Sequence, residues 1–582
     1  MTTIDTLIRG ATLVDGTAEA ARQADVTICE GRIGQIAAPF SVDAASAAAV
    51  VDAEGLILAP GFIDPHTHYD AQLFWDAHAT PSSLHGVTTV IGGNCGFTIA
   101  PLGDAKDVDY IRKMLAKVEG MPLPALEAGL PWDWHGFGEY LSRFEGKIGV
   151  NAAFLVGHCA LRRVVMGERA VGHEATDVEI EQMVALLHES IEGGGLGFST
   201  SLSFTHTDWE GDPVPSRWAS HKEVLALCRA LREHEGTTLE FIIDGCLKGF
   251  TDEEIDLITE MSLTANRPAN WNVLTVEARS PERVARPLER SDRAAERGAR
   301  VVALTMPTIA GMCASFGTHS ALHSIPGWSF VMSLPIPERI EKLRDPEIRR
   351  ELDERARSKE AGVFAGLARW AGYRIGTTVS AQNEGLEGRL VRDIAAERGG
   401  SPFDTLLDIV IADELRTVLW PAQPGEDADS WALRKQTWEH PNVMLGGSDA
   451  GAHLDRMCGS TYPTSFLQDV LHGRQLVSLE DAVHMMTAVP AELFGLRERG
   501  IVAEGNHADL VLFDPEQIGS NENAFQRDLP GDSERLTAGS QGIRCVWVNG
   551  ERSIVDGAPT GPCAGKILQP GRDTTTAPMK AR

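Results

Sequence analysis

Positive charge is scarce in this sequence. Lys and Arg together number 53 against 82 Asp and Glu, which gives a formal net charge of -29 at neutral pH. A surface of that sign repels the phosphates of nucleic acids and anionic lipid headgroups. The sequence therefore predicts neither a nucleic-acid partner nor a membrane partner.

Paired cysteines and long apolar runs are lacking as well. The nine cysteines are an odd number, lie far apart and include no Cys-x-x-Cys pair, a pattern typical of reduced thiols. No apolar run approaches the roughly 18 residues that span a bilayer. The amino terminus, Met1 to Gly10, carries Asp5 and does not resemble a signal peptide. We expect a cytoplasmic protein.

Length and composition are those of a globular protein. The chain has 582 residues, 43% hydrophobic and 23% charged, so nothing indicates wholesale disorder. A soft prior of about 150 residues per domain would allow four domains, but a (β/α)8 barrel alone takes about 250 residues or more.

Both ends of the chain are rich in short β-like runs. Near the amino terminus these runs are broken by Asp15-Gly16 and Glu30-Gly31, dipeptides that signal tight hairpins. The carboxyl end repeats the pattern at 508–514 and 545–551. We predict one composite β domain built from residues 1–60 and 498–570, followed by a flexible tail at 571–582.

Between the two ends, strand-like runs alternate with helix-like stretches, the order expected of a parallel sheet. The predicted strands are the run before His66 and the segments 88–91, 151–156, 197–199, 238–242, 271–275, 300–304 and 443–446. Helices are predicted at 177–192 and 220–234, with Ser220 as N-cap. Residues 61–497 form the expected barrel region, in which 310–373 fits poorly; we interpret that segment as an insertion, with a charged helix at 337–360 and a lid as its expected role.

The most informative motif is the stretch from Pro60 to Asp70, which contains His66-Thr67-His68. Two histidines at i and i+2 on a strand point to the same side, so both imidazoles can reach one metal ion. A His-x-His pair alone is a weak signal, but this surrounding sequence makes it a strong one.

Two further segments carry candidate groups at strand ends. Cys95, in Gly92 to Phe97, would face the mouth of a barrel, where a thiolate can bind zinc, although a cysteine among glycines is more often structural. Asp449 follows the strand 443–446 among small residues, so its carboxylate can reach the same metal; the alternative is a helix-capping aspartate.

These motifs occur in an order that resembles the amidohydrolase superfamily, and within it the N-acyl-D-amino-acid deacylase (D-aminoacylase) branch. The resemblance covers 60–101, 194–203 and 383–514. It implies an α/β fold, a (β/α)8 TIM-like barrel with a small β-sandwich domain formed by both termini. It also implies that Cys95 is a zinc ligand and that Asp449 takes a proton from the metal-bound water and passes it to the leaving amine.

The resemblance extends to the substrate. Arg456 falls where these deacylases place an arginine for the substrate carboxylate, and a guanidinium offers a bidentate fork for it; a surface salt bridge explains it almost equally well. His158, after a predicted strand, is a candidate for substrate contact, although a hydrogen-bonded core histidine is the commoner case. His206 is a weaker candidate, because solvent-facing histidines are common.

The sequence departs from the branch at two strands. The deacylases carry a His at the end of the fifth strand and another at the end of the sixth, the latter followed closely by a Lys, whereas the segments 238–245 and 270–277 contain no histidine. Glu240 or Asp244 is a candidate replacement ligand, because carboxylates also bind zinc, and Asn272 is a candidate polar substitute at the other strand. The sequence therefore predicts hydrolysis and leaves the specificity for N-acyl-D-amino acids open.

The sequence thus predicts a metal-dependent hydrolase of non-peptide C–N bonds. Its expected cofactor is Zn2+, as one or two divalent ions held by His66, His68, Cys95, Asp449 and Glu240, and its expected partner is a small-molecule amide. A homo-oligomer is left open. The alternatives are hydrolysis of a cyclic amide, carbamate or ester on the same scaffold, and a non-catalytic relative that has lost the metal.

Overall fold

The computed structural model describes residues 4–317 and 321–580, which form two compact units. The first unit holds Met1–Thr308, Asp427–Ala452 and Gly459–Arg582, and the second holds Ile309–Glu426 and His453–Cys458. No helix in these residues is long and apolar enough to cross a membrane.

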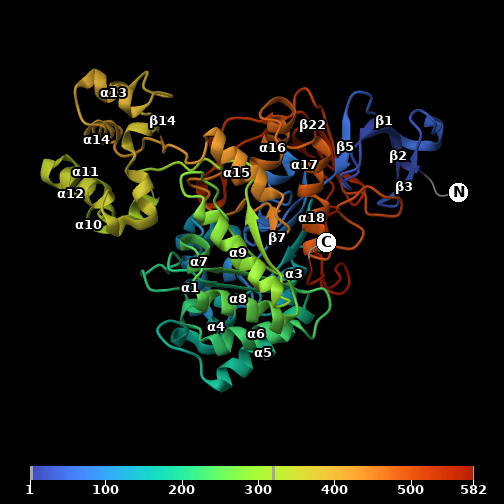
Figure 1. The fold of residues 1–582 in the computed structure, drawn as a ribbon, viewed down its shortest axis with the longest axis horizontal. Coiled ribbons are helices and arrows are strands. Elements are labelled where there is room, and N and C mark those ends of the chain that lie inside the picture. Colours follow the sequence, from blue (N-terminus) through green and yellow to red (C-terminus); the bar gives the residue numbers. More distant parts are fainter. Residues whose placement is uncertain (1–3, 318–320, 581–582) are drawn as a thin grey trace. The chain divides into compact units, whose positions relative to one another are not determined.

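The β domain of the first unit combines the two ends of the chain in one nine-stranded sheet, in which β17 lies between β22 and the amino-terminal strand β5. Figure 1 labels β22 and β5 of this sheet. Its buried core gathers aliphatic side chains from both ends around Trp547. The strands are β1 (Ile4–Leu13), β2 (Arg22–Cys29), β3 (Arg32–Ala37), β4 (Ala47–Asp52), β5 (Ile57–Pro60), β17 (Leu510–Phe513), β22 (Ile543–Val548), β23 (Glu551–Val555) and β24 (Ala558–Pro559).

One of the two predicted hairpins is tight. Glu30 and Gly31 join β2 to β3 with φ of 51° and 78°, the positive values that a two-residue type I′ turn requires. The other is not, because β1 ends at Leu13 and β2 begins only at Arg22. In that loop the Asp15 carboxylate accepts a hydrogen bond from the Thr17 backbone and pairs with Arg22.

The first unit also contains a barrel of eight parallel strands, with β8 and β9 acting as one interrupted strand. Its first and last strands meet through the isolated parallel bridge between Thr67 and Ala450. The strands are β6 (Phe62–Asp64), β7 (Val87–Gly92), β8 (Asn151–Phe154) with β9 (Val156–Gly157), β10 (Gly197–Leu202), β11 (Thr238–Ile243), β12 (Ala269–Trp271), β13 (Val301–Thr305) and β16 (Val443–Leu445).

The outer helices follow the predicted alternation. Helix α5 spans Asp177–Glu192 as predicted, and α6 spans His221–Leu231 with the Ser220 hydroxyl accepting from the Glu223 amide. Thr176 and Glu179 form a capping box at the start of α5, in which each side chain accepts from the other's backbone N–H. The other helices of the first unit are α1 (Ala105–Val118), α2 (Leu123–Gly129), α3 (Phe137–Ser142), α4 (His158–Met166), α7 (Asp244–Lys248), α8 (Asp252–Ala265), α9 (Glu282–Glu296), α15 (Ala428–Trp438), α16 (Tyr462–His472), α17 (Leu479–Met486) and α18 (Ala488–Leu493).

The sixth barrel strand lies earlier than predicted. We expected a strand at 271–275, but β12 ends at Trp271 because its ladder with β11 pairs Leu239 with Ala269 and stops at Trp271. Beyond it the chain bends, and the Leu274 amide still donates to the Leu304 carbonyl at 2.7 Å. The bend turns Asn272 away from the ladder.

The second unit has a hydrophobic core of its own, in which Trp370 packs against Trp328 and Phe403 with ring centroids 5.9 and 4.8 Å away. It extends to Glu426, well beyond the predicted insertion at 310–373. The predicted helix at 337–360 is two helices, because Pro346 follows the N-cap Asp345 and starts a new one. Its helices are α10 (Ser329–Met332), α11 (Ile336–Arg344), α12 (Pro346–Ala356), α13 (Val391–Arg398) and α14 (Pro402–Ala412), with the short strands β14 (Arg374–Ile375) and β15 (Leu419–Trp420).

The prediction of a flexible tail at 571–582 is wrong for the residues described there. Thr574 is fully buried, and its hydroxyl donates to the Gly236 carbonyl at 2.7 Å. The Thr575 amide donates to the Gly495 carbonyl at 2.7 Å. This packing could not be predicted from the sequence, because the segment is polar and is held by hydrogen bonds of buried hydroxyl and backbone groups, which leave no apolar pattern in the sequence.

Candidate metal centre

His66 and His68 follow β6 at the carboxyl end of the barrel. The intervening Thr67 amide donates to the Ile91 carbonyl at 2.9 Å, and the His68 amide donates to the Ala450 carbonyl at 2.7 Å. These bonds fix the backbone between β7 and the last strand of the barrel. Both histidines are buried, as the predicted site requires.

Cys95 lies in a single 3-10 turn, Asn94–Gly96, directly after β7. Its φ is 55°, a left-handed conformation that costs a non-glycine residue about 1–2 kcal/mol. Its amide donates to Glu240 Oε2 at 2.8 Å, and the next amide, of Gly96, donates to Ser199 Oγ at 3.0 Å. β10 and β11 therefore hold the turn that presents the thiol.

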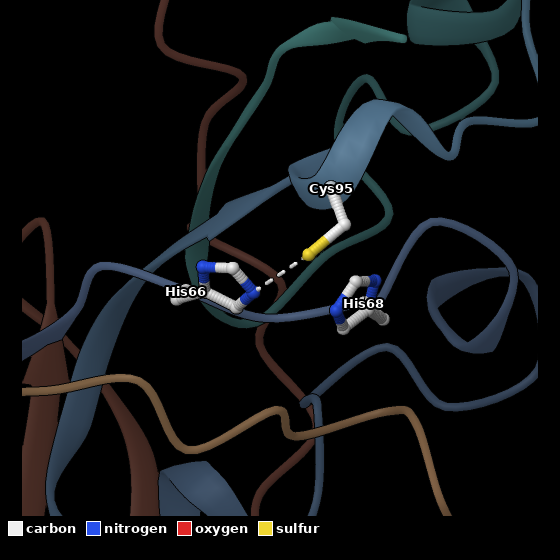
Figure 2. Close-up of side chains that lie close together, drawn as sticks. All are labelled: His66, His68 and Cys95. Atoms are coloured by element: carbon white, nitrogen blue, oxygen red, sulfur yellow. Dashed lines mark hydrogen bonds between the residues drawn. The ribbon is translucent and has the colours of Figure 1, made fainter. Parts of the chain in front are cut away.

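The three predicted ligands come together. Figure 2 shows the sulfur of Cys95 between the two imidazole rings, with a dashed line to His66, whose Nε2 lies 3.5 Å from Sγ. One ligand atom from each of the three residues lies within 4.8 Å of the others. Zinc with bonds of about 2.0–2.3 Å to nitrogen and sulfur separates neighbouring ligands by roughly 3.5 Å, so the cluster has the dimensions of a metal site.

Asp449 reaches the same place from the end of β16, as predicted. Its Oδ1 lies 3.2 Å from His66 Nε2 and 3.9 Å from His68 Nε2. Asn272 Nδ2 donates to this oxygen at 3.1 Å. Gly447, at φ 92°, permits the arrangement, because a Cβ there would lie 2.4 Å from Asn272 Oδ1.

The electrostatics of these groups fit a buried cation. Burial, with the nearby Asp64, raises the pKa of Asp449 to about 7, and burial raises the pKa of Cys95 and Glu240 well above their usual values. Burial also lowers the pKa of His68 to about 3, so that the imidazole is a neutral ligand. A bound cation offsets the cost of burying carboxylates and favours the thiolate.

Glu240 is placed differently from the three clustered ligands. Its Oε2 accepts from the Cys95 amide, and its Oε1 is buried with no hydrogen-bond partner in the described part of the chain. The carboxylate thus lies on the backbone of Cys95 with one oxygen unused. Its predicted role as a ligand remains a prediction that this geometry allows.

Sequence reasoning missed Glu119. Its Oε2 lies 3.6 Å from His68 Nε2, and the residue is 3% exposed. It follows α1, in the long connection after β7. No motif marks it, and its burial, rare for a glutamate, is visible only in the structure.

The candidate substrate residue His158 is occupied in the interior. Its Nδ1 lies 2.8 Å from Thr200 Oγ1, and its Nε2 lies 2.8 Å from Glu223 Oε1, which Arg162 also binds at 2.6 Å. All four side chains are fully buried. With both ring nitrogens engaged, His158 has no group left for a substrate, and the alternative of a hydrogen-bonded core histidine describes it.

Arg456 belongs to the second unit. Its guanidinium lies 2.8 Å from His453 Nδ1 and 3.1 Å from Asp455 Oδ1, and its carbonyl accepts from the Cys313 amide. Its contact with a substrate carboxylate stays a prediction.

The comparison with protein families identifies the chain. The model described as "Amidohydrolase family" matches residues 49–554. The chain belongs to the amidohydrolase family. Two relatives of this amidohydrolase come from Alcaligenes xylosoxydans xylosoxydans: an N-acyl-D-aspartate deacylase, 29% identical over 97% of this chain and 95% of the relative, and a D-aminoacylase, 29% identical over 97% of each.

Solved structures agree with this assignment. A crystal structure of D-aminoacylase aligns with a TM-score of 0.62 and 26% identity, covering 97% of this amidohydrolase and all of the other chain. An N-acyl-D-glutamate deacylase from Bordetella bronchiseptica, complexed with zinc and a phosphonate inhibitor, aligns with a TM-score of 0.61 at 23% identity, which shows the fold. The amidohydrolase therefore has the predicted fold, a TIM-like barrel with a β-sandwich domain.

Proposed function

We propose that this amidohydrolase is a metal-dependent hydrolase of the amide bond in an N-acylated amino acid. The observation that carries the proposal is the cluster of His66, His68 and Cys95, with the Asp449 carboxylate 3.2 Å from His66 Nε2. The full-length similarity to enzymes named as N-acyl-D-amino-acid deacylases supports the substrate class.

The residues present fit a divalent metal, for which zinc is the best candidate. Two neutral imidazoles and a thiol form a ligand set that zinc prefers, and the unused Glu240 Oε1 offers a further oxygen. The similar D-aminoacylase has a binuclear metal centre in which one metal activates and the second attenuates. We propose one metal held by His66, His68 and Cys95, with Glu240 and Asp449 as the groups available to it or to a second ion.

The metal, when bound, polarises the substrate carbonyl and activates a water molecule. Asp449 then acts as the base that accepts the proton of the attacking water and as the acid that returns it to the nitrogen of the leaving amine, so that one proton moves and the C–N bond breaks. Asn272 orients the carboxylate by donating to Oδ1. Glu240 holds the Cys95 turn through its amide.

The test is a substrate panel with the Asp449→Asn variant. The panel contains N-acetyl derivatives of D and L amino acids with acidic, neutral and basic side chains, together with hydantoin, dihydrouracil, a carbamate and a carboxylic ester. We expect zinc-loaded wild type to release an amino acid from at least one N-acetyl substrate, and Asp449→Asn to lose about 10²- to 10⁴-fold in kcat. Asp177→Asn, on the exposed face of α5, is the matched control and should keep full activity.

Other outcomes separate the alternatives. If only the cyclic amides, the carbamate or the ester are hydrolysed, the enzyme acts on that kind of bond and not on an N-acylated amino acid. Protein purified without added metal that contains none, binds no zinc and hydrolyses nothing would be the non-catalytic relative. Full activity of Asp449→Asn would remove this residue from the mechanism.

A further inference from the structure

Glu119 is a buried carboxylate at the edge of the metal cluster. It is the C-cap of α1, where its amide donates to the Leu115 carbonyl at 2.9 Å. Its side chain is 4% exposed, and it belongs to the same compact unit as the two histidines of the cluster. Its Oε2 lies 3.6 Å from His68 Nε2. The proposed reaction gives this carboxylate no role.

Two carboxylates converge on one nitrogen of His68. Glu119 Oε2 lies 3.6 Å and Asp449 Oδ1 lies 3.9 Å from Nε2. Both separations exceed the roughly 2.7–3.2 Å of an N–H···O hydrogen bond, so this nitrogen is hydrogen-bonded to neither oxygen. Nitrogen and oxygen ligands that bind one zinc ion at about 2.0–2.2 Å lie roughly 3.3–3.6 Å apart in tetrahedral geometry. Glu119 and His68 therefore have the spacing of two ligands on one ion.

The position of Glu119 is costly for a carboxylate. The side chain is withdrawn from water, and glutamate is among the residues least often found buried. It also follows the last turn of α1, and the carboxyl-terminal end of a helix carries the negative end of the helix dipole. A divalent cation beside Oε2 offsets both costs. A glutamate that only ended the helix could keep its side chain in water.

The charges of the cluster also favour a further anionic ligand. His66 and His68 are neutral when they bind a metal, so the thiolate of Cys95 is the one negative charge among these three groups. Asp449 loses its charge when it accepts the proton of the attacking water, and the charge that it offers the ion is therefore not constant. The carboxylate of Glu119 supplies a negative charge that stays through the reaction.

We propose that Glu119 is a ligand of the metal ion and binds it through Oε2 on the side of His68. This ligand comes from the connection after β7 and not from the end of a barrel strand. The segments 238–245 and 270–277, which follow later strands, contain no histidine that could take this place. The inference rests on the metal site of the proposed function and adds one ligand to it.

The first test is zinc affinity, measured by chelator competition. Glu119→Gln keeps the volume of the side chain and removes its charge, and we expect it to bind zinc about 30- to 100-fold more weakly than wild type. Glu192→Gln is the matched control, because Glu192 also stands at the carboxyl-terminal end of a helix, α5, but is exposed. Its zinc affinity should stay within twofold of wild type.

A carboxylate that only lies near the ion can also change its affinity, so two further measurements are needed. In crystals of the zinc-loaded wild type, an oxygen of Glu119 should lie about 2.0–2.2 Å from the anomalous-scattering peak of the ion. In hydrogen exchange at saturating zinc, the ion should slow the amides of residues 115–120 at least tenfold in wild type but not in Glu119→Gln. The amides of Thr67 and His68 should be slowed in both proteins.

Each measurement can contradict the proposal. Glu119 is not a ligand if Glu119→Gln binds zinc within threefold of wild type, if the ion lies more than about 3 Å from both oxygens of Glu119, or if zinc still slows residues 115–120 in the variant. None of these readouts needs turnover. A wild type that binds zinc through Glu119 and hydrolyses nothing in the panel contradicts the proposed function alone, whereas a wild type that binds no zinc contradicts both.

Discussion

Single residues decide whether the metal site can form, and Cys95 is the clearest case. Its thiol lies in a turn whose two amides are held by side chains of β10 and β11. The sequence alone favoured a structural cysteine, and only the resemblance to deacylases made it a ligand candidate. The 3.5 Å contact with His66 Nε2 now supports the ligand role on geometry.

Replacement of this thiol should weaken metal binding. We predict that Cys95→Ser lowers zinc affinity at least 100-fold, because a serine hydroxyl does not supply the soft anionic ligand that a thiolate does. Chelator competition monitored by elemental analysis measures the change. Cys228→Ser, at another buried free cysteine on α6, is the control; equal zinc affinities of the two variants would show that Cys95 does not bind the metal.

The residues of the site divide by how visible they are in the sequence. His66, His68, Cys95 and Asp449 stand at strand ends within motifs, so the order of the strands brings them together. Glu119 ends α1 in a connection that carries no motif, so sequence reasoning missed it. His158 was a candidate for substrate contact because it follows a predicted strand. Its position in the sequence does not show that both of its ring nitrogens have buried hydrogen-bond partners.

At the scale of elements, the bounds of α5 could be predicted from the sequence, whereas the segment 337–360 proved to be two helices. The range of α5 follows from its apolar spacing and from Thr176 and Glu179 at its start. The bounds of β12 could not be found in this way, because the apolar run continues past Trp271 while the ladder with β11 does not. Register depends on the partner strand, which local sequence does not contain.

The capping box of α5 provides a prediction about stability alone. Thr176→Ala removes the hydroxyl that accepts from the Glu179 amide, so the free energy of unfolding should fall by about 1 kcal/mol. Thr176→Ser keeps the acceptor and should differ little from wild type. Denaturant unfolding measures the difference, and panel activity should not change; a loss of activity without a loss of stability would contradict an effect confined to the helix end.

At the scale of the whole molecule, His85 links parts of the first unit that are distant in sequence. It is fully buried, with Nδ1 2.6 Å from Thr464 Oγ1 of α16 and Nε2 3.0 Å from the carbonyl of Ala538. Burial lowers its pKa from 6.5 to about 4. The unfolded chain therefore binds a proton between these two pH values that the folded chain does not.

The sign of the effect follows from this difference. Above pH 6.5 the imidazole is neutral in both states and the stability does not depend on it; as the pH falls from 6.5 towards 4 the unfolded chain takes up the proton first, so the free energy of unfolding falls by about 3 kcal/mol in all. We predict that the unfolding free energy of His85→Gln depends less steeply on pH between 6.5 and 4, by up to one proton. Urea unfolding at several pH values measures the slopes, and parallel curves for the variant and wild type would contradict the assignment.

The seam of the barrel, where Thr67 meets Ala450 in a single bridge, has a consequence for the order in which the protein matures. His66 and Asp449 lie on opposite sides of this seam, and the β domain likewise needs strands from both ends of the chain. A ribosome that has released only the first half of the chain has therefore made His66, His68 and Cys95 but neither the Asp449 carboxylate nor the last strand of the barrel. The metal centre is completed only after Asp449 has been synthesised, so a chain truncated before the last barrel strand should bind the ion more weakly, and the bound ion should stabilise the contact between the first and last strands of the barrel.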